Sequence, residues 1–191
     1  MTIIFATETT GTPKNYKAPP ADTDNWPRMV QLAWVLINDD GKLIRGFTFN
    51  IQPDGWTVEP GAEAVHGLSL ERLQETGHPA PKIIQKFFDD YDTADTLVAH
   101  NMNFDFNILA AEAIRYRLQA KTRIARKVCT MEASTDLLKL RGGFRGGYKW
   151  PKLSELHEYL FQQGFDGAHD ALVDVQACAR CFFELKKRGV L

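Results

Sequence analysis

The chain has few cysteines and no long apolar run. Its 191 residues include three cysteines, Cys129, Cys178 and Cys181, and this small, odd number argues against a disulfide framework and favours a reducing compartment. The C-x-x-C of Cys178 and Cys181 has no second ligand pair, so core packing is a better interpretation than a zinc site. No apolar stretch approaches the roughly 20 residues that span a bilayer, and the first residues lack the features of a signal peptide. We therefore expect a cytoplasmic protein without a membrane partner.

Net charge is also low, at −1, which argues against a general nucleic-acid binder. The charge is unevenly distributed, however. Residues 115–152 hold eleven Lys or Arg and two acidic residues, a net charge of +9, so the rest of the chain carries −10. This segregation predicts one face that attracts a polyanion. The alternative is a solvated basic face without a partner.

Apolar segments alternate along the chain in a pattern that predicts an α/β fold. We expect strands at Thr2–Phe5, Val30–Asn38, Lys42–Ile51, Thr96–Ala99 and Lys127–Thr130. We expect helices at Ser69–Glu75, Pro81–Tyr91, Phe104–Leu118, Met131–Leu140, Leu153–Phe161 and Asp170–Lys187. A turn signal at residues 39–41 makes the second and third strands a hairpin. This order is typical of a mixed five-stranded sheet flanked by helices, and the absence of a second core predicts one domain over residues 1–191.

The first candidate site residue, Glu8, directly follows the first expected strand. Its carboxylate would lie at or just past the edge of the sheet, where side chains converge on a ligand. Thr9, Thr10 and Gly11 are small and leave room beside it. By itself, this segment is better explained as a solvated turn after the strand.

A second carboxylate, Asp105, opens the helix that follows the fourth strand. The helix dipole favours a carboxylate in the first turn, where it often caps the helix. Capping is therefore the alternative to a functional role. We expect His100 and Asn101, between the strand and the helix, to fix the turn by hydrogen bonds.

The segment His169–Asp174 is the most specific. We expect His169 just before the last helix and Asp174 one turn inside it, where the helix is apolar on its packing side. A carboxylate there is costly unless it is paired or binds a metal. Histidine has an unperturbed pKa of about 6.5, which suits it to accept a proton from a metal-bound water. An isolated histidine at a helix start would more simply be a cap or a surface residue.

Together, Phe5–Gly11, His100–Asp105 and His169–Asp174 closely resemble the three motifs of the DEDD exonucleases, in the DnaQ-like subgroup with a histidine in its third motif. Pro27–Trp34 and Val65–Ser69 extend the resemblance over nearly the whole chain. The resemblance implies a ribonuclease-H-like fold. It also implies metal-dependent 3′→5′ hydrolysis of single-stranded DNA, or of frayed 3′ ends, to nucleoside 5′-monophosphates.

The same resemblance implies a two-metal site. The ions would be Mg²⁺ or Mn²⁺, the ligands Glu8, Asp105 and Asp174, and the catalytic residues Glu8 and His169, with His169 as the base. The family motif reads Asp-x-Glu, however, and Ala6 occupies the position of its aspartate. That aspartate bridges both ions in the family, so we expect at least one ion to be weakly held or absent and the activity to be impaired. Because clustered carboxylates without a metal repel one another, their retention favours an engineered inactive variant over a natural pseudo-enzyme.

Substrate contacts are also implied by the resemblance, at Thr9, Thr10, Gly11, His66 and Phe104. The alternative for His66 is a turn residue before a helix. The loop 141–151 is basic, Gly-rich and aromatic, so we expect Arg145 and Lys149 to meet the phosphates of a single strand with a free 3′ end. The alternative for this loop places Trp150 in the core beside Leu153.

Two other functions stay open. The loop carries two Arg-Gly-Gly units, which favours a 3′→5′ exoribonuclease or oligoribonuclease as the first alternative, although we prefer DNA. The second alternative is a binding module of another class, either a non-catalytic module that binds nucleic-acid ends or a polymerase-associated subunit with a structural role. The oligomeric state and any protein partner are not indicated.

Overall fold

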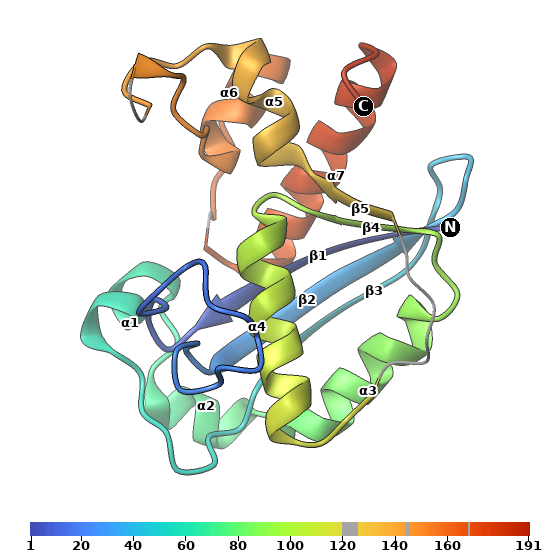
Figure 1. Ribbon diagram of the computed structural model, residues 1–191. Helices are drawn as coiled ribbons and strands as arrows, with labels where there is room; N and C mark the ends of the chain where they lie inside the picture. Colours follow the sequence, from blue (N-terminus) through green and yellow to red (C-terminus); the bar gives the residue numbers. More distant parts are fainter. Residues whose placement is uncertain (120–125, 144–145, 168) are drawn as a thin grey trace.

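A mixed five-stranded sheet forms the centre of the molecule (Figure 1). The computed structural model describes residues 1–119, 126–143, 146–167 and 169–191. The strands are β1 (Thr2–Thr9), β2 (Met29–Ile37), β3 (Leu43–Asn50), β4 (Thr96–Ala99) and β5 (Arg126–Cys129), in the order β3-β2-β1-β4-β5. β1, β2 and β3 are antiparallel neighbours, whereas β4 and β5 run parallel to β1. The predicted hairpin and mixed sheet are thereby confirmed.

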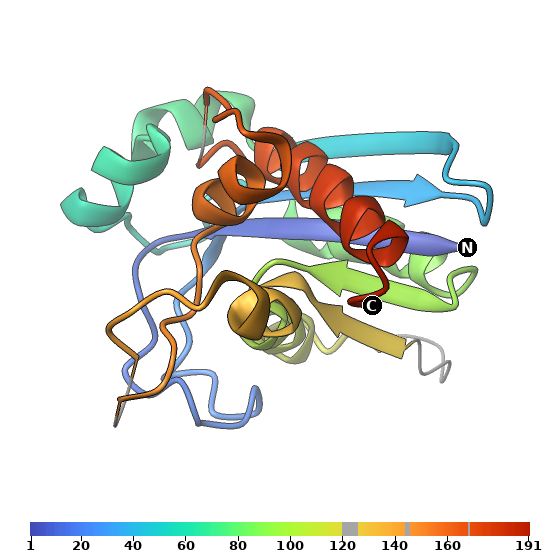
Figure 2. The same ribbon diagram turned by 90° about the horizontal axis from the view of Figure 1, so that it is seen from above.

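Helices cover both faces of this sheet (Figure 2). They are α1 (Pro60–His66), α2 (Leu70–Thr76), α3 (Ala80–Tyr91), α4 (Met102–Arg115), α5 (Thr130–Leu138), α6 (Leu153–Phe161) and α7 (Ala171–Lys187). α3 and α4 enclose the larger core on one face, α7 covers the other face, and α6 packs against α7. Among the described residues, no helix combines the length and apolarity needed to cross a bilayer.

The side chains of β1 alternate between the two faces, as in any strand. Ile3 and Phe5 belong to the core under α3 and α4. Ile4 belongs to the cluster under α7, and Ala6 packs against that cluster. The same alternation directs Glu8 toward the α7 face, so Ala6 and Glu8 are neighbours on one side of the sheet.

Two differences from the expected elements bear on the site. β1 continues to Thr9 rather than ending at Phe5, because its pairing with β2 continues through Glu8 opposite Gln31 to Thr9 opposite Met29. Glu8 is therefore held within the sheet instead of following it. α1 was not expected, and it has no buried residue, so its sequence carries no apolar periodicity that would predict a helix.

Other helix and strand boundaries differ from the expected ones by one to three residues. α4 begins at Met102 and ends at Arg115, earlier at both ends than expected, and its last turn gives way to Arg117 in a left-handed conformation. Thr130 opens α5 instead of ending β5. Such shifts are usual for helix ends, which local sequence specifies weakly.

Candidate active site

Three of the predicted residues meet where β1 ends under the start of α7. Glu8, His169 and Asp174 each offer one ligand atom, and these atoms lie within 4.8 Å of one another. They line a cavity of about 330 Å³. Ala6 and Asp105 line the same cavity, so the structure brings all five positions of the predicted catalytic and metal set to one place.

The start of α7 is held by hydrogen bonds that orient this cluster. Asp170 caps the helix by accepting from the N–H groups of Leu172 and Val173 at 2.9 and 3.3 Å. His169 precedes the cap with a φ of 73°, in the left-handed region. Its N–H donates to Asp174 Oδ1 at 3.4 Å. The turn before α7 thus places the imidazole beside the carboxylate one turn into the helix.

Asp105 comes from the opposite face, on α4. Its Oδ1 accepts from both the N–H and the hydroxyl of Thr7, at 2.9 and 2.8 Å. The alternative that Asp105 caps its own helix is therefore wrong, since the carboxylate instead fastens α4 to β1. Asp105 also lines the cavity that Glu8 and Asp174 share.

Burial of these like charges changes their ionisation. Burial, followed by the charges of Asp174, Asp105 and Asp170, raises the pKa of Glu8 to about 8. Burial raises the pKa of Asp105 to about 7 and also raises that of Asp174. Carboxylate oxygens are the donors that Mg²⁺ and Mn²⁺ prefer, so the residues present fit a hard divalent cation.

Ala6 leaves a gap in this donor set. Its half-buried methyl group lines the cavity on the same face of β1 as Glu8, and it faces Ala33 across the antiparallel pair. A methyl group offers no lone pair to a metal or to water. The position that resembles the family's aspartate is thus correctly placed for a ligand but lacks one.

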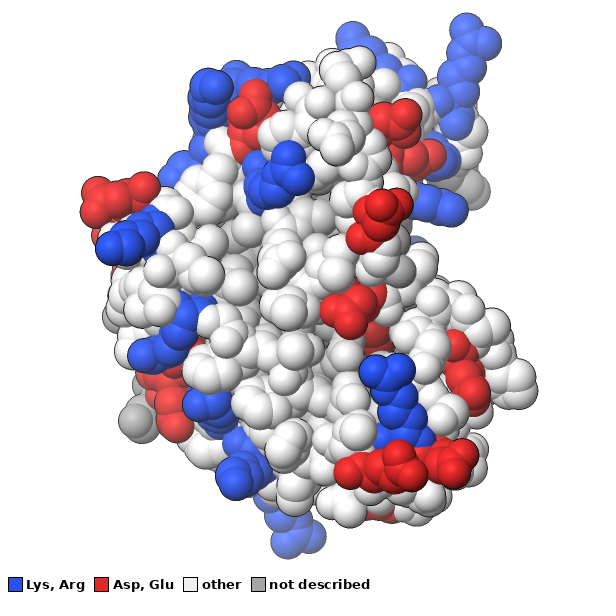
Figure 3. All heavy atoms as spheres, turned by 180° about the vertical axis from the view of Figure 1, so that it is seen from behind, with Lys and Arg blue, Asp and Glu red and all other residues white. Residues whose placement is uncertain are grey.

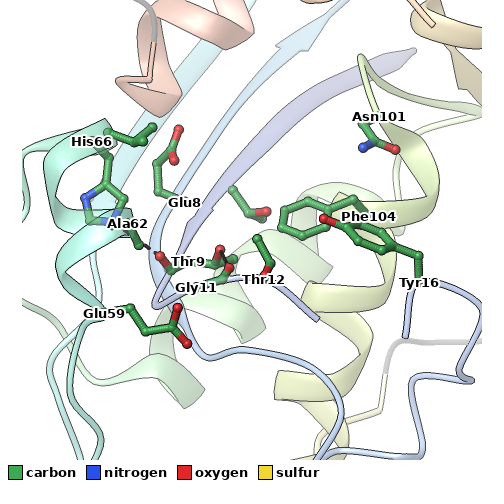
Figure 4. A pocket seen from close by; sticks show the side chains of 13 residues that line it. Glu8, Thr9, Gly11, Thr12, Tyr16, Glu59, Ala62, His66, Asn101 and Phe104 are labelled. Atoms are coloured by element: carbon green, nitrogen blue, oxygen red, sulfur yellow. Dashed lines mark hydrogen bonds between the residues drawn. The ribbon is translucent and has the colours of Figure 1, made fainter. Parts of the chain in front are cut away.

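A second cavity of about 430 Å³ adjoins the first and shares Thr7, Glu8, Asn101 and Phe104 with it (Figure 4). It lies between the end of β1, α1 and α4. Of the predicted substrate residues, Thr9, Gly11, His66 and Phe104 line it. Thr10 does not, because its hydroxyl accepts from the N–H of Arg28 at 3.0 Å.

His66 is fixed against β1 at the end of α1. Its Nδ1 accepts from the N–H of Leu68 at 3.0 Å, and its Nε2 contacts Thr9 O at 3.2 Å. Since a carbonyl can only accept, Nε2 carries the proton and the ring is neutral. Burial lowers the pKa of His66, which agrees with this form. His66 therefore forms a wall of the cavity.

His100 joins the cavity to the segment before α6. Its Nδ1 contacts the Thr130 hydroxyl at 3.0 Å and its Nε2 contacts Pro151 O at 2.9 Å. Burial lowers the pKa of His100 to about 4, so the ring stays neutral. This is the turn-fixing role expected from the sequence, extended to a segment far along the chain.

The loop before α6 does not pack into the core, whereas its expected contacts with phosphates stay a prediction. Trp150 is 63% exposed, so the alternative that places it in the core is wrong. Lys149 pairs with Glu155, with 2.6 Å between Nζ and Oε1, and its charge is already balanced. Arg145 and Phe144 lie outside the described residues.

Residues near the cavities that reasoning from the sequence missed include Thr7, Tyr16, Gln31 and Glu59. Asn101 was expected to fix the turn, but its side chain makes no capping hydrogen bond, and it lines both cavities. Gln31 accepts from the N–H of Ala171 at 2.9 Å and so ties α7 to β2. The available signal was one polar side chain within an apolar strand. Tyr16 and Glu59 come from irregular segments, and the sequence offers no signal for their position.

Comparison with protein-family models matches residues 3–182 to the RNase T exonuclease family. E. coli exonuclease I in complex with a dT13 oligonucleotide has a similar fold, with a TM-score of 0.78 and 18% identity over 98% of this chain and 41% of that one. The zinc-bound complex of E. coli exonuclease I with single-stranded DNA gives 0.75 and 19%, over 98% and 40%. This chain thus spans about two fifths of those proteins. No curated protein sequence matches it significantly.

Proposed function

Because the chain belongs to the RNase T exonuclease family of the DEDD superfamily, we propose that it is a metal-dependent 3′→5′ exonuclease domain, impaired by Ala6. Its substrate would be single-stranded DNA or a frayed 3′ end, and its products nucleoside 5′-monophosphates. The convergence of Glu8, His169 and Asp174 within 4.8 Å carries this proposal. Glu8 lies near the start of the chain, whereas His169 and Asp174 lie near its end. The fold brings the buried carboxylates of Glu8 and Asp174 together, and a divalent cation would neutralise the negative charge of these carboxylates.

Each residue has a definite part in this proposal. Glu8 and Asp174 would hold a divalent ion, with Asp105 reaching it directly or through water; such an ion stabilises negative charge on a phosphodiester and makes a bound water more acidic. His169 is exposed at the cavity rim, where its imidazole can take a proton from the attacking water and release it to solvent.

The second cavity would receive the 3′-terminal nucleotide. It opens directly onto Glu8, and its walls are Phe104 on α4 and His66 with Ala62 on α1 (Figure 4). A flat apolar ring such as Phe104 suits a nucleobase. A volume of about 430 Å³ falls within the range of small-molecule sites.

Oligonucleotide complexes of structurally similar proteins support single-stranded DNA as the substrate. An exoribonuclease remains the alternative on the same chemistry. Ala6 is the observation that favours a non-catalytic end-binder. It removes a metal ligand, while the cavity and the remaining carboxylates would still accept a strand. One domain over residues 1–191 and a cytoplasmic location complete the proposal.

Restoring the missing ligand tests the proposal. Ala6→Asp should produce Mg²⁺- or Mn²⁺-dependent release of 5′-mononucleotides from a single strand labelled at its 3′ end. Ala6→Asn is the matched control, because asparagine has nearly the same shape but no charge. Parallel DNA and RNA strands distinguish the two substrate classes, and a 5′-labelled strand reports the direction.

A failure to restore activity would contradict the proposal. If the Ala6→Asp protein is folded and metal-loaded but releases nothing from either strand, the exonuclease proposal is wrong. Strand binding by that inert protein would then support the end-binding alternative.

A further inference from the structure

An exposed aromatic and basic surface lies beside the candidate active site. We name it the rim platform and define it as residues 139–143 and 146–152, between α5 and α6. Two of its side chains, Tyr148 and Trp150, are 45% and 63% exposed. Burial of such large rings ordinarily contributes much to stability, so their exposure together indicates a contact surface.

Hydrogen bonds hold the backbone of the rim platform in one shape. The N–H of Lys149 donates to Leu140 O at 2.8 Å, and that of Gly143 donates to Gly147 O at 3.1 Å. Gly143 has no room for a Cβ because the carbonyl oxygens of Gly147 and Tyr148 lie against it. The aromatic rings are therefore presented by a constrained backbone, which reduces the entropy lost when a ligand binds.

The rim platform is attached directly to the active-site cavity. Pro151 O, one residue after Trp150, accepts from His100 Nε2 at 2.9 Å. Leu153, two residues further on, lines the cavity with His100, Glu8 and other residues. The backbone of the rim platform thus reaches the wall of the cavity, and Trp150 is three residues from the cavity-lining Leu153.

Positive charge accompanies the rings. Lys139, Arg141 and Lys152 are exposed, and no salt bridge within the described residues engages them, although the charge of Lys152 helps to lower the pKa of Glu155. Lys149, in contrast, is paired with Glu155. Figure 3 shows Lys and Arg side chains projecting from the upper right of the molecule, above a notch in its outline, with Asp and Glu side chains among them. Unpaired cations with exposed rings suit a polyanion with free bases better than an apolar protein surface.

We propose that the rim platform binds single-stranded nucleic acid on the 5′ side of the cavity. Trp150 and Tyr148 stack on unpaired bases, while Lys139, Arg141 and Lys152 meet the phosphates. The inference rests on the proposed function, because the strand reaches the rim platform from a 3′ end held in the cavity. Since every base has a stacking face, affinity should follow strand length rather than sequence.

Binding to the present protein, in which Ala6 limits turnover, tests this inference. Fluorescence anisotropy in Mg²⁺ compares a dinucleotide with a single strand of about 12 nucleotides. Trp150→Ala should weaken binding of the long strand about tenfold, as for the loss of one stacked base, and leave dinucleotide binding unchanged. Trp150→Phe should restore most of the affinity. Tyr159→Ala, which removes a ring 41% exposed on α6, is the matched control and should change neither affinity.

The contribution of the charged residues of the rim platform is measured separately, by the dependence of affinity on salt. Arg141→Ala should reduce the slope of log affinity against log salt by about one for the long strand. Lys82→Ala, at an exposed position of α3, is the matched control and should leave the slope unchanged.

Failure of the inference and failure of the proposed function are distinguishable. If folded Trp150→Ala binds the long strand as the parent does, while both proteins bind the dinucleotide, the rim platform has no role and the proposed function stands. If the parent binds neither ligand, both are overturned.

Discussion

Ala6 presents a methyl group where a carboxylate would add a further metal ligand to the cluster of Glu8, His169 and Asp174. Strand alternation places positions 6 and 8 on the same face, and both line one cavity. We therefore expect a carboxylate at position 6 to extend into this cavity without a change of the backbone. At the scale of single residues, Ala6 is therefore the position that, in our proposal, impairs hydrolysis but leaves strand binding.

His169 carries the second prediction at this scale. In the Ala6→Asp background, His169→Ala should lower the single-turnover rate about 10²-fold or more, because a general base is lost. Strand affinity should change little, since the imidazole is exposed at the rim. His169→Asn provides a second variant, because asparagine readily adopts the left-handed backbone found there.

A matched control for His169 is His78→Ala. His78 is an exposed histidine beside Phe49, remote from the cavity, and its removal should leave the rate unchanged. Full single-turnover rates in both His169 variants would exclude His169 as the base.

The elements of the site depend on a few cross-links between them. Thr7 bonds Asp105 and so joins β1 to α4, while Gln31 bonds the first N–H of α7 and joins it to β2. Gln31 also faces Glu8 across the β1–β2 pair. These contacts determine how far the carboxylate on α7 lies from the one on β1.

Gln31→Leu should separate those elements. Leucine has a similar size but cannot accept from Ala171 N–H, so one buried donor is left unpaired and the free energy of unfolding should fall by about 1–3 kcal/mol. In the Ala6→Asp background the Mg²⁺ concentration for half-maximal activity should rise, because Asp174 is no longer held in position. Urea unfolding and a metal titration measure the two effects.

Gln85→Leu is the matched control for this change. Gln85 is exposed on α3 and bonds only Asp89 within the described residues, so the same substitution should alter neither quantity. Equal metal requirements in Gln31→Leu and its parent would show that the Gln31 contact does not position Asp174.

For the whole molecule, the proposed metal site predicts that stability depends on divalent ions. Without an ion, burial and mutual repulsion raise the pKa values of Glu8, Asp105 and Asp174. A cation that binds only the folded state adds about 2.7 kcal/mol at a hundred times its Kd. In a domain of this size, each kcal/mol raises Tm by about 2–4 °C.

We therefore expect Mg²⁺ or Mn²⁺ to raise the Tm of the Ala6→Asp protein by several degrees and that of the present protein by less. Glu8→Gln should abolish the increase in both, whereas Glu71→Gln, at an exposed position of α2, should not. Differential scanning fluorimetry with and without a chelator measures these shifts. An equal metal-dependent increase in the Glu8→Gln protein would contradict the site.

Much of the fold was already predictable from local patterns. The hairpin, the strand Thr96–Ala99 and the helix Leu153–Phe161 follow from apolar periodicity and turn residues, which depend on near neighbours in the chain. Strand ends were harder to predict, because pairing with β2 rather than local preference extends β1 to Thr9. α1 carries no apolar stripe and gave no signal.

The candidate site, like the fold, could be predicted from the sequence only in part. The sequence by itself determined which residues are candidates to bind a metal or move a proton, because Glu8, Asp105, His169 and Asp174 stand in motifs that resemble those of the DEDD exonucleases. Only the tertiary structure decided that Glu8 meets His169 and Asp174, that Asp105 bonds Thr7 instead of capping α4, and that Trp150 is exposed. These contacts join residues far apart in the chain, and their geometry follows from packing α4 and α7 on opposite faces of one sheet rather than from any local pattern.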